Sequence, residues 1–340
     1  MLNAIDLFAG CGGLTQGLRQ AGFSVKAAVE LDANAARVYR ANHARTKMVE
    51  RTIREVQGEE LVSAIPSGVC HLLAGCPPCQ GFSSLRRLNR KRSVRDERND
   101  LVLDFLRLVE EVQPLTVMME NVPGLTDYYL FKRLTRHLVE LGYYLDYKVL
   151  NVKDFGIPQS RKRLVLMGSR VGEVELSEKP LRPRSVRQAI GSLEPAHTSA
   201  DPCHNVERHH SPEVLERIQL TPTNGGSWRD LPEEMWLACH KKKGAGFHDV
   251  YGRMKWDDVA PTITGGCLNP SKGRFIHPVA DRAITPREAS LLQSFPKGYR
   301  FLMDISLDQL ARQIGNALPP KFSQYHGRYL KAHLNAAGYN

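Results

Sequence analysis

Along the amino-terminal part of the chain, the spacing of apolar residues switches repeatedly between two periods, which predicts strands that alternate with helices. Short apolar runs bounded by turn residues predict strands at residues 3–8, 25–29, 69–74 and 116–119. Apolar residues three or four positions apart predict helices at residues 15–20, 33–42 and 100–112. Such alternation is typical of an α/β protein whose sheet is mostly parallel and doubly wound.

A glycine-rich turn follows the first predicted strand. Residues 9–14 (Ala-Gly-Cys-Gly-Gly-Leu) lead into a helix, where a ligand can approach the backbone and face the helix N-terminus. The spacing is not the G-x-G-x-x-G of dinucleotide sites, which disfavours a nicotinamide cofactor. Glu30, roughly 20 residues further on, ends the second strand and is placed to accept hydrogen bonds from ribose hydroxyls. We expect an adenosine-type cofactor; the alternative is an ordinary turn whose glycines serve only packing.

The third predicted strand runs into residues 75–83 (Gly-Cys-Pro-Pro-Cys-Gln-Gly-Phe-Ser). The two prolines forbid a helix and force the chain into a rigid, extended turn. A cysteine in such a turn lies where open α/β sheets bind ligands, which favours a nucleophile. Two other interpretations stay open at this point. The cysteine can be a small buried hydrophobic residue, or Cys76 and Cys79 can form a redox pair.

Two further features point to the same edge of the sheet. Glu120 ends the fourth predicted strand before a Pro-Gly turn, which places it at the same edge as Cys79, although most glutamates at turns are merely exposed. Residues 84–99 are mainly basic and have little apolar periodicity. A long polar loop beside an active site is often a lid, and arginines suit phosphate contacts. The alternative is a solvated charged loop.

Composition and charge restrict the class of protein. A chain of 340 residues, 42% of them hydrophobic, is long enough for two domains with a substantial core. It contains no membrane-spanning apolar run and starts without a signal-like segment, so we expect a cytoplasmic protein. Seven cysteines without repeated spacing argue against a disulfide scaffold. The net charge of +11 favours polyanionic partners; the alternative is a basic surface that serves only solubility.

From about Glu194 the sequence becomes richer in Pro, Gly, His and Asn and has few periodic helices. Residues 185–193 predict a last helix before this change, and helices return at residues 287–295 and 321–336. We expect no metal site, with histidines that are exposed or contact phosphate, because the spacing of the candidate ligands matches no compact zinc pattern. These candidates are His204, His209, His210, His240, Cys203 and Cys239.

Taken in order, the motifs resemble those of the DNA cytosine-5 methyltransferase family over nearly the whole chain. Residues 6–13 are similar to its S-adenosylmethionine loop, residues 75–83 to its nucleophile turn and residues 120–122 to its Glu-Asn-Val motif. Further matches are residues 159–163 (Q-x-R-x-R), residues 287–296 (the late helix motif) and residues 314–320 (the closing cofactor motif). One position departs from the family. Where the family usually carries an aspartate for the adenine amino group, this chain has Thr52, which leaves that contact to a backbone carbonyl or to Glu50.

The resemblance implies an S-adenosylmethionine-dependent methyltransferase fold in three segments: a catalytic and cofactor-binding domain (1–193), a smaller target-recognition domain (194–304) and a return to the catalytic domain (305–340). It implies S-adenosyl-L-methionine as the cofactor. The implied catalytic residues are Cys79, Glu120, Arg161 and Arg163. The implied cofactor-binding residues are Phe8, Ala9, Gly10, Gly12, Gly13, Leu14, Glu30, Leu31, Pro78, Leu101, Asn316 and Ala317. The implied DNA-binding residues are Ser83, Arg86, Arg87, Arg90, Arg92, Thr262, Thr264 and Gly265.

The family reaction gives these residue types their roles. Cytosine C5 is a poor nucleophile, so a thiolate at Cys79 would first add to C6 and make C5 an enamine-like carbon. Glu120 would neutralise charge that builds at N3 of the ring. Arg163, together with Arg161, would hold the base oxygen and orient the acid. Because a base inside a duplex is out of reach of these groups, the cytosine must be flipped out.

The expected function is methylation of a cytosine at C5 within a short specific site of double-stranded DNA. The resemblance implies an enzyme of the bacterial modification type that acts as a monomer, with or without a separate cognate restriction endonuclease. Two alternatives are the tRNA-methylating branch of the family and a catalytically inactive DNA-binding relative. The size and basic character of residues 194–284 favour a DNA reader over the tRNA branch. A thiol oxidoreductase that uses Cys76 and Cys79 is a weaker third interpretation.

Overall fold

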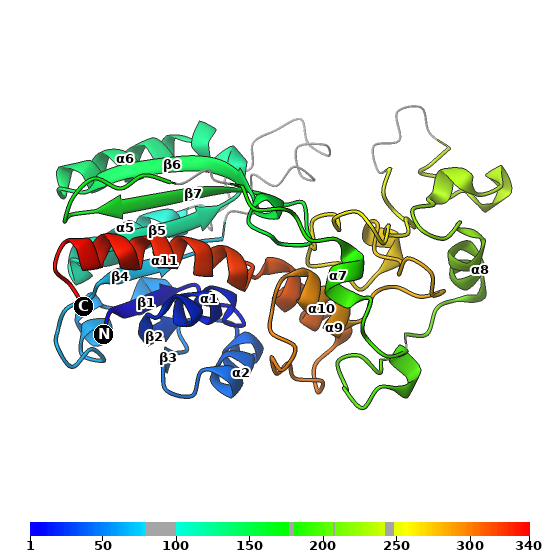
Figure 1. Cartoon of the computed structure of the whole chain (residues 1–340), viewed down its shortest axis with the longest axis horizontal. Coiled ribbons are helices and arrows are strands. Elements are labelled where there is room, and N and C mark those ends of the chain that lie inside the picture. Colours follow the sequence, from blue (N-terminus) through cyan, green and yellow to red (C-terminus); the bar gives the residue numbers. More distant parts are fainter. Residues whose placement is uncertain (79–99, 177–179, 207, 242–247) are drawn as a thin grey trace. The chain divides into compact units, whose positions relative to one another are not determined.

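The chain forms two compact units built from segments far apart in sequence. The computed structural model describes residues 1–78, 100–176, 180–206, 208–241 and 248–340. Unit 1 comprises residues 1–155, 162–180 and 317–340, and unit 2 comprises residues 156–161 and 181–316. The path of the chain from blue to red in Figure 1 shows that unit 1 contains both the first and the last helix.

Unit 1 is organised around a seven-stranded sheet with the strand order β3-β2-β1-β4-β5-β7-β6. The strands are β1 (Asn3–Leu7), β2 (Ser24–Val29), β3 (Lys47–Val49), β4 (Leu72–Gly75), β5 (Thr116–Asn121), β6 (Tyr144–Asn151) and β7 (Lys162–Ser169). The strands from β3 to β5 in this order are parallel, whereas β7 runs antiparallel to both of its neighbours. This confirms the predicted α/β class and the mostly parallel sheet. The order reverses direction between β1 and β4, the kind of point at which open α/β sheets bind ligands.

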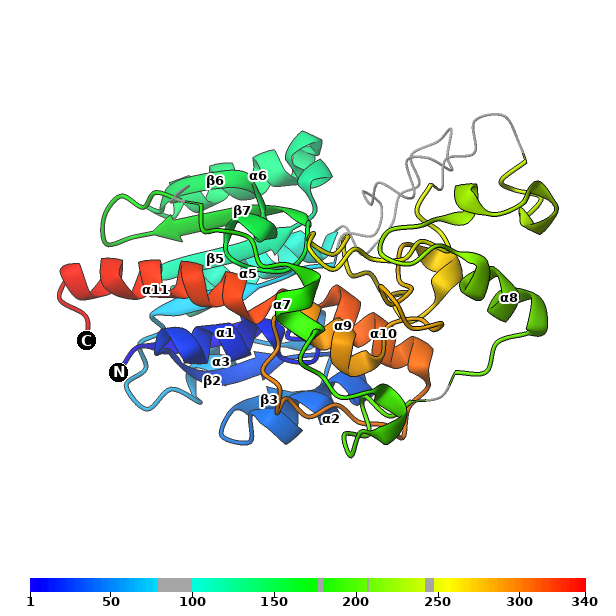
Figure 2. The same cartoon turned by 45° about the vertical axis from the view of Figure 1, so that its right-hand side comes forward.

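Helices cover both faces of this sheet. They are α1 (Gly13–Ala21), α2 (Ala33–Asn42), η1 (Ile53–Glu55), α3 (Gly58–Val62), α5 (Leu101–Val112), η4 (Pro123–Asp127), α6 (Tyr129–Glu140), η5 (Val152–Asp154) and α11 (Pro320–Ala336). Residues of α3, α5 and α6 share one apolar core with Ile5 and Leu7 of β1. Side chains alternate along a strand, so Asp6 of β1 points to the other face, where it bonds to α1. On that face α1 packs along α11 (Figures 1 and 2).

The carboxyl ends of the parallel strands lie in one register row. Leu7 of β1 pairs with Val29 of β2 and with Gly75 of β4, and Gly75 pairs in turn with Met119 of β5. The residues that follow this row are therefore brought to one edge of the sheet. They are Phe8 and the glycine turn, Glu30, Cys76 with the two prolines, and Glu120. The structure thus gathers at one edge the turns that the sequence identified separately.

Unit 2 contains short helices joined by irregular segments. Its helices are α7 (Val186–Ile190), η6 (Ala196–Thr198), α8 (Pro212–Leu220), η7 (Trp228–Asp230), η8 (Glu233–Met235), η9 (Pro270–Lys272), α9 (Pro286–Leu292) and α10 (Leu307–Asn316). Within its described residues, strand pairing is limited to isolated bridges such as Gln159 with Ala260. The unit boundaries at 180/181 and 316/317 differ from the predicted domain ends at 193 and 304. The reason is that α7 and α10 both pack against α9 and so belong to unit 2.

In the part of the chain that the structure describes, every helix is too short or too polar to cross a membrane.

The packing of α1 on α11 gives a first prediction, because it depends on a glycine. A Cβ at Gly17 of α1 would lie 2.1 Å from the carbonyl oxygen of Pro320 and 2.7 Å from the amide nitrogen of Gln324, both backbone atoms. We expect Gly17→Ala to lower the free energy of unfolding by about 1–3 kcal/mol through overpacking. Urea denaturation followed by circular dichroism measures this. Gly298→Ala is the matched control, because a Cβ there meets nothing within 4 Å. Equal stability of the two variants would contradict the close helix contact.

A second prediction concerns His326 of α11, which is buried among Phe155, Phe322 and Tyr325. Neither ring nitrogen has a hydrogen-bond partner among the described residues, and burial lowers the pKa from 6.5 to about 3. The unfolded chain therefore binds a proton at this residue between these two pH values whereas the folded chain does not. Folding stability should fall as pH drops below 6.5, by up to about 1.4 kcal/mol per pH unit.

We expect His326→Leu to remove this part of the acid sensitivity. The difference in unfolding free energy between pH 7.5 and pH 5 should be smaller in the variant than in the parent protein, as measured by urea titration at both pH values. His209 is exposed, so His209→Gln should leave the difference unchanged. If both variants lose as much stability at pH 5 as the parent protein does, the claim that His326 is buried in its neutral form is wrong.

Candidate active site

The glycine turn after β1 has a backbone that only a few residue types adopt readily. Gly10 and Gly12 have φ values of 54° and 94°, and Phe8 has a φ of 60° although it carries a side chain. Left-handed backbone costs energy at a residue with a Cβ and marks a constrained site. A Cβ at Gly10 would point into open space, so this glycine does not serve packing. The turn therefore leaves open space beside Gly10, close to the N-terminus of α1, as a ligand-binding loop requires.

Glu30 joins the end of β2 to this turn. One carboxylate oxygen accepts a hydrogen bond from the Gly10 amide at 2.7 Å and the other accepts one from the Asp32 amide at 2.8 Å. Burial raises the pKa of Glu30, and these backbone hydrogen bonds oppose the shift. Each carboxylate oxygen has a second acceptor site, so the side chain can bind further hydroxyl groups while it holds the turn. The neighbouring Leu31 is 68% exposed and so presents an apolar side chain beside the half-buried Glu30.

The turn after β4 is fixed by backbone contacts on two sides. Gly75 has no room for a side chain, because a Cβ would lie 2.9 Å from the Leu7 carbonyl oxygen. The Cys76 amide donates to that carbonyl at 3.3 Å. On the other side, the Asn121 side chain of β5 donates to the Pro77 carbonyl at 2.9 Å. The chain segment that leads to Cys79 is thus anchored to β1 and β5. Cys79 itself lies outside the described residues.

Glu120 and Arg163 form a buried ion pair at the same edge. Arg163 is the second residue of β7, which runs antiparallel to β5, so the start of β7 lies beside the end of β5. The Nε atom of Arg163 is 2.7 Å from Oε1 of Glu120, and their side chains are 16% and 9% exposed. Despite this short distance, Oε1 of Glu120 accepts no hydrogen bond within the described part of the chain, because the N–H group of Arg163 does not point at it. A buried carboxylate with unused acceptor capacity is suited to a polar ligand.

Arg161 is placed differently from Arg163. It belongs to unit 2, where its guanidinium donates to the carbonyl oxygens of Ile263 at 3.0 Å and Gly315 at 2.8 Å. Gln159 lies beside it and bonds to the Gln293 side chain at 2.8 Å and to the Ile263 amide at 2.9 Å. These bonds hold the segment that precedes β7. The described contacts of Arg161 therefore indicate a structural role, in which it holds the backbone at Ile263 and Gly315.

The remaining predicted residues divide into three sets. Leu14 is buried in α1, Leu101 and Ala317 are half-buried, and Asn316 is exposed at the end of α10 in unit 2. Near the predicted adenine contact, Glu50 pairs with Arg40 at 2.6 Å and Thr52 directly precedes η1. The predicted DNA-binding residues Ser83, Arg86, Arg87, Arg90 and Arg92 lie outside the described residues, as does Cys79.

In unit 2, the predicted DNA-binding segment 262–265 is part of a closely packed turn. The Thr262 hydroxyl donates to the Ser160 carbonyl at 2.8 Å. A Cβ at Gly315 would lie 2.1 Å from the Thr264 carbonyl oxygen, so α10 approaches this turn through a glycine. Thr262, Thr264 and Gly265 are each half-buried. Their backbone is therefore fixed, while part of each residue remains open to a partner.

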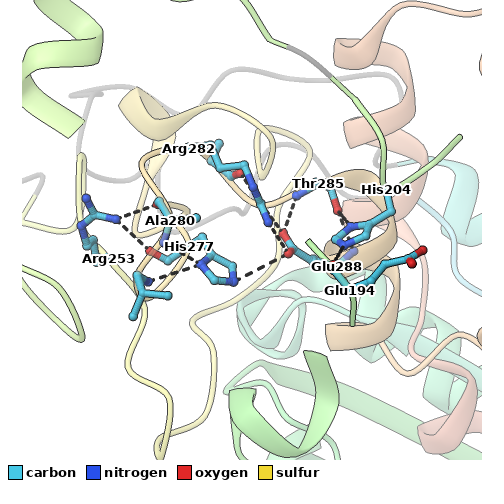
Figure 3. Close-up of polar contacts among 10 residues, drawn as sticks. Glu194, His204, Arg253, His277, Ala280, Arg282, Thr285 and Glu288 are labelled. Carbon is cyan, nitrogen blue, oxygen red and sulfur yellow. Dashed lines mark hydrogen bonds and ion pairs between the residues drawn. The ribbon is translucent and has the colours of Figure 1, made fainter. Parts of the chain in front are cut away.

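A buried charged network orders the neighbouring segment of unit 2 (Figure 3). Arg282 binds both carboxylate oxygens of Glu288 at 2.7 Å, and His277 lies 3.8 Å from the same carboxylate. Burial lowers the pKa of His277 to about 4, so the ring is neutral at neutral pH. Arg253 is 1% exposed and donates to several backbone carbonyls, among them those of His277 and Ala280. Unit 2 thus uses buried ion pairs and backbone-binding arginines where unit 1 uses a sheet.

The histidines of unit 2 correct one expectation from the sequence. His204 and His240 are 1% and 6% exposed, so they are not surface residues. His204 bonds to the Thr285 hydroxyl at 2.8 Å and to the Glu194 carbonyl at 2.9 Å (Figure 3). His240 stacks on Trp228 with ring centroids 4.1 Å apart. Across the described ranges, no group of three or more His, Cys, Asp or Glu side chains is placed to hold a metal ion.

Three residues of these arrangements had no assigned role in the sequence interpretation. Asn121 lies within a quoted motif, but only the structure shows its bond to Pro77. Gln293 likewise lies within a quoted motif, and its amide donates to the Ile314 carbonyl at 2.7 Å. The Tyr39 hydroxyl lies 2.8 Å from that of Thr15, but Tyr39 has apolar neighbours at helical spacing and is typical of a core residue, so nothing in the sequence marks its hydroxyl.

Comparisons with known proteins identify the family. Residues 2–332 match the family model described as C-5 cytosine-specific DNA methylase. The chain is 40% identical to the Type II methylase M.HgiDII of Herpetosiphon aurantiacus, over 97% of this chain and 95% of the relative. It is 34% identical to the Type II methyltransferase M1.BsuMI of Bacillus subtilis, over 95% and 78% of the two chains. The crystal structure of a candidate DNA modification methyltransferase encoded within a prophage (E. coli) matches with a TM-score of 0.75 and 26% identity, over 98% of this chain and 100% of that chain.

The sequence match extends along both units and therefore includes the glycine turn, Glu120 and Arg163. Two relatives exceed 30% identity over nearly all of this chain. The chain belongs to the C-5 cytosine-specific DNA methylase family and is a DNA (cytosine-5)-methyltransferase.

Proposed function

We propose that this DNA (cytosine-5)-methyltransferase modifies one cytosine within a short specific site of double-stranded DNA, that it uses S-adenosyl-L-methionine, and that it acts through a covalent adduct of Cys79. The observation that carries the proposal is the common edge of the sheet. The glycine turn with Glu30, the anchored turn before Cys79 and the Glu120–Arg163 pair all follow one register row. The names of the relatives M.HgiDII and M1.BsuMI support a Type II modification role.

The residues at this edge fit an adenosine-type cofactor. The Gly10 position opens into free space, the Glu30 carboxylate has unused acceptor sites, and the exposed Leu31 offers an apolar surface beside them. Glu30 would hold the ribose hydroxyls, and the backbone of the turn would face the amino-acid part. When bound, S-adenosyl-L-methionine supplies an electrophilic methyl group. The surrounding residues orient the cytosine and activate its C5 atom.

In the proposed reaction, the thiolate of Cys79 forms a bond to C6 of the cytosine, and the C5–C6 π electrons move toward C5 and N3. Glu120 shares a proton with N3, which neutralises the negative charge that builds there. Arg163 keeps the Glu120 carboxyl group in place and donates to the base oxygen. After C5 has gained the methyl group, a base removes the C5 proton. The released electron pair re-forms the C5–C6 double bond and expels the Cys79 thiolate.

Unit 2 is the proposed target-recognition unit. Its ordered turn at residues 262–265 and its exposed loop at residues 223–224 offer backbone and hydroxyl groups to DNA. Because Glu120 is buried and Arg163 half-buried in unit 1, a cytosine must leave the base stack to contact them. We propose action as a monomer, with a cognate restriction endonuclease, where one exists, acting separately. Bisulfite sequencing of DNA from cells that express the protein would identify the site and the modified cytosine.

The alternatives differ in substrate or in activity. An enzyme of the tRNA-methylating branch would transfer labelled methyl groups from S-adenosyl-L-methionine to tRNA and not to duplex DNA. A catalytically inactive relative would bind DNA without any transfer. The 40% identity to a Type II methylase along the whole chain favours transfer to DNA.

We expect the protein to transfer labelled methyl groups to duplex DNA and Cys79→Ser to abolish the transfer, because a serine hydroxyl is a far weaker nucleophile at neutral pH. Duplex DNA with 5-fluorocytosine at the site should form a stable covalent complex, because fluorine at C5 cannot leave as a proton. Gel electrophoresis under denaturing conditions detects this complex. Cys76→Ser should still form it, which separates the nucleophile from a redox pair. No transfer to any duplex DNA would refute the function.

We expect Glu120→Gln to lower kcat by about 10²–10⁴-fold, because the amide cannot share a proton with the ring. Binding of S-adenosylhomocysteine, measured by isothermal titration calorimetry, should stay unchanged. Glu110→Gln, which changes an exposed glutamate of α5, is the control. Arg163→Ala should give a similar loss of kcat, whereas Arg170→Ala, just after the far end of β7, should not. If Glu120→Gln retained full kcat, the acid role would be wrong.

A further inference from the structure

Beneath the glycine turn, three buried polar side chains form a continuous chain that connects β1, α1 and α2. The Thr15 hydroxyl of α1 lies 2.6 Å from Oδ2 of Asp6 in β1 and 2.8 Å from the hydroxyl of Tyr39 in α2. All three side chains are fully buried. The other Asp6 oxygen, Oδ1, has no hydrogen-bond partner among the described residues. The proposed reaction uses none of these groups.

The direction of the hydrogen bonds follows from the number of protons. A threonine hydroxyl has one proton, and a carboxylate oxygen accepts it. Thr15 therefore donates to Asp6, and Tyr39 donates to Thr15. Removing the Thr15 hydroxyl would break both bonds at once, so that among the described residues Asp6 keeps only its bond with the Thr15 backbone and Tyr39 only its bond with Thr46. Removing the Tyr39 hydroxyl would leave the bond between Thr15 and Asp6 in place.

A second pair supports the same turn from α2. The Nδ1 atom of His43 lies 3.1 Å from Nη1 of Arg19, and an arginine can only donate, so Nδ1 is an acceptor and the proton is on Nε2. Burial, and then the charge of Arg19, lower the pKa of His43 to about 4, while a hydrogen bond to the Gly12 backbone opposes this shift. A bond that favours the protonated ring has the ring as its donor, so the acceptor is the Gly12 carbonyl.

The two arrangements hold the turn at points that Glu30 does not reach. Glu30 binds the Gly10 amide, His43 binds the Gly12 carbonyl, and Thr15 ties the first turn of α1 to β1. The charged groups around Asp6 and His43 are Glu30 at the end of β2 and Arg19 on α1. The residues with left-handed backbone, Phe8, Gly10 and Gly12, are thus held by the contacts of Thr15 and His43 as well as by Glu30.

We infer that Thr15 and His43 are positioning residues for the cofactor: together with Asp6, Tyr39 and Arg19, they hold the glycine turn in the shape that binds the adenosine ligand. This inference rests on the proposed use of S-adenosyl-L-methionine at that turn. Neither residue touches the ligand. Their loss should weaken cofactor binding through the backbone of residues 8–12 and leave DNA binding unchanged.

The test uses Thr15→Val, which keeps the shape of the side chain but removes its hydroxyl, and Thr15→Ser, which restores the hydroxyl. We expect Thr15→Val to weaken binding of S-adenosylhomocysteine, measured by isothermal titration calorimetry, by about tenfold to a hundredfold. The affinity of Thr15→Ser for S-adenosylhomocysteine should lie within about threefold of that of the parent protein. The affinity of Tyr39→Phe should lie between those of Thr15→Val and Thr15→Ser. The matched control is Thr135→Val, since among the described residues the Thr135 hydroxyl bonds only to carbonyls of its own helix α6.

The second measurement is amide hydrogen exchange of the protein without ligand. Thr15→Val and His43→Phe should speed exchange at residues 9–13 and leave exchange in the β4–β5 core unchanged. If Thr15→Val fails to fold, Tyr39→Phe tests the same chain through its outer bond. Unchanged ligand affinity and unchanged exchange in Thr15→Val, or equal losses in Thr15→Ser and Thr15→Val, would overturn the inference. If the parent protein itself does not bind S-adenosylhomocysteine, the proposed cofactor is wrong, and the exchange data alone decide the role of the polar chain.

Discussion

The constraint on which unit 1 depends is the shared register of its parallel strands. β1, β2, β4 and β5 end in one row, so the turns that follow them meet at a single edge. A slip of one residue in β5 would turn Glu120 from one face of the sheet to the other and would expose its apolar neighbours. Burial of Ile5, Leu73 and Val117 beneath α5 therefore sets the position of the polar groups as firmly as it sets the core.

The site edge gathers acidic groups that cost stability. Asp6, Glu30 and Glu120 all lie within two residues of the register row, and burial raises the pKa of Asp6 to about 7. An ion pair such as Glu120 with Arg163 loses much of its attraction to desolvation, so the fold gains little from it. Buried carboxyl groups with unused acceptor positions, such as Oδ1 of Asp6, are typical of sites that are arranged for binding and chemistry rather than for stability.

The sequence predicted the alternation of unit 1 well because its strands and helices have strong, local periodicity. The four predicted strands and three predicted helices are present with ends within three residues of those predicted. It did not predict which residues hydrogen-bond across elements. Arg161 and Arg163 belong to one motif, yet one binds backbone carbonyls in unit 2 and the other pairs with Glu120. His204 is buried because Thr285 and Glu194 satisfy both ring nitrogens, and contacts over such sequence distances leave no local pattern.

The contact between α1 and α11 also has a consequence for how the protein forms during synthesis. Gly17 lies against the Pro320 backbone, so the first helix of unit 1 packs on one that the ribosome adds some 300 residues later. Until then, the part of α1 that packs on α11 has no cover, and the whole of unit 2 must be translated in between. Nascent chains with such a face exposed are prone to aggregate and depend on chaperones. Production of active protein should therefore depend on holding the amino-terminal segment in solution until α11 has left the ribosome.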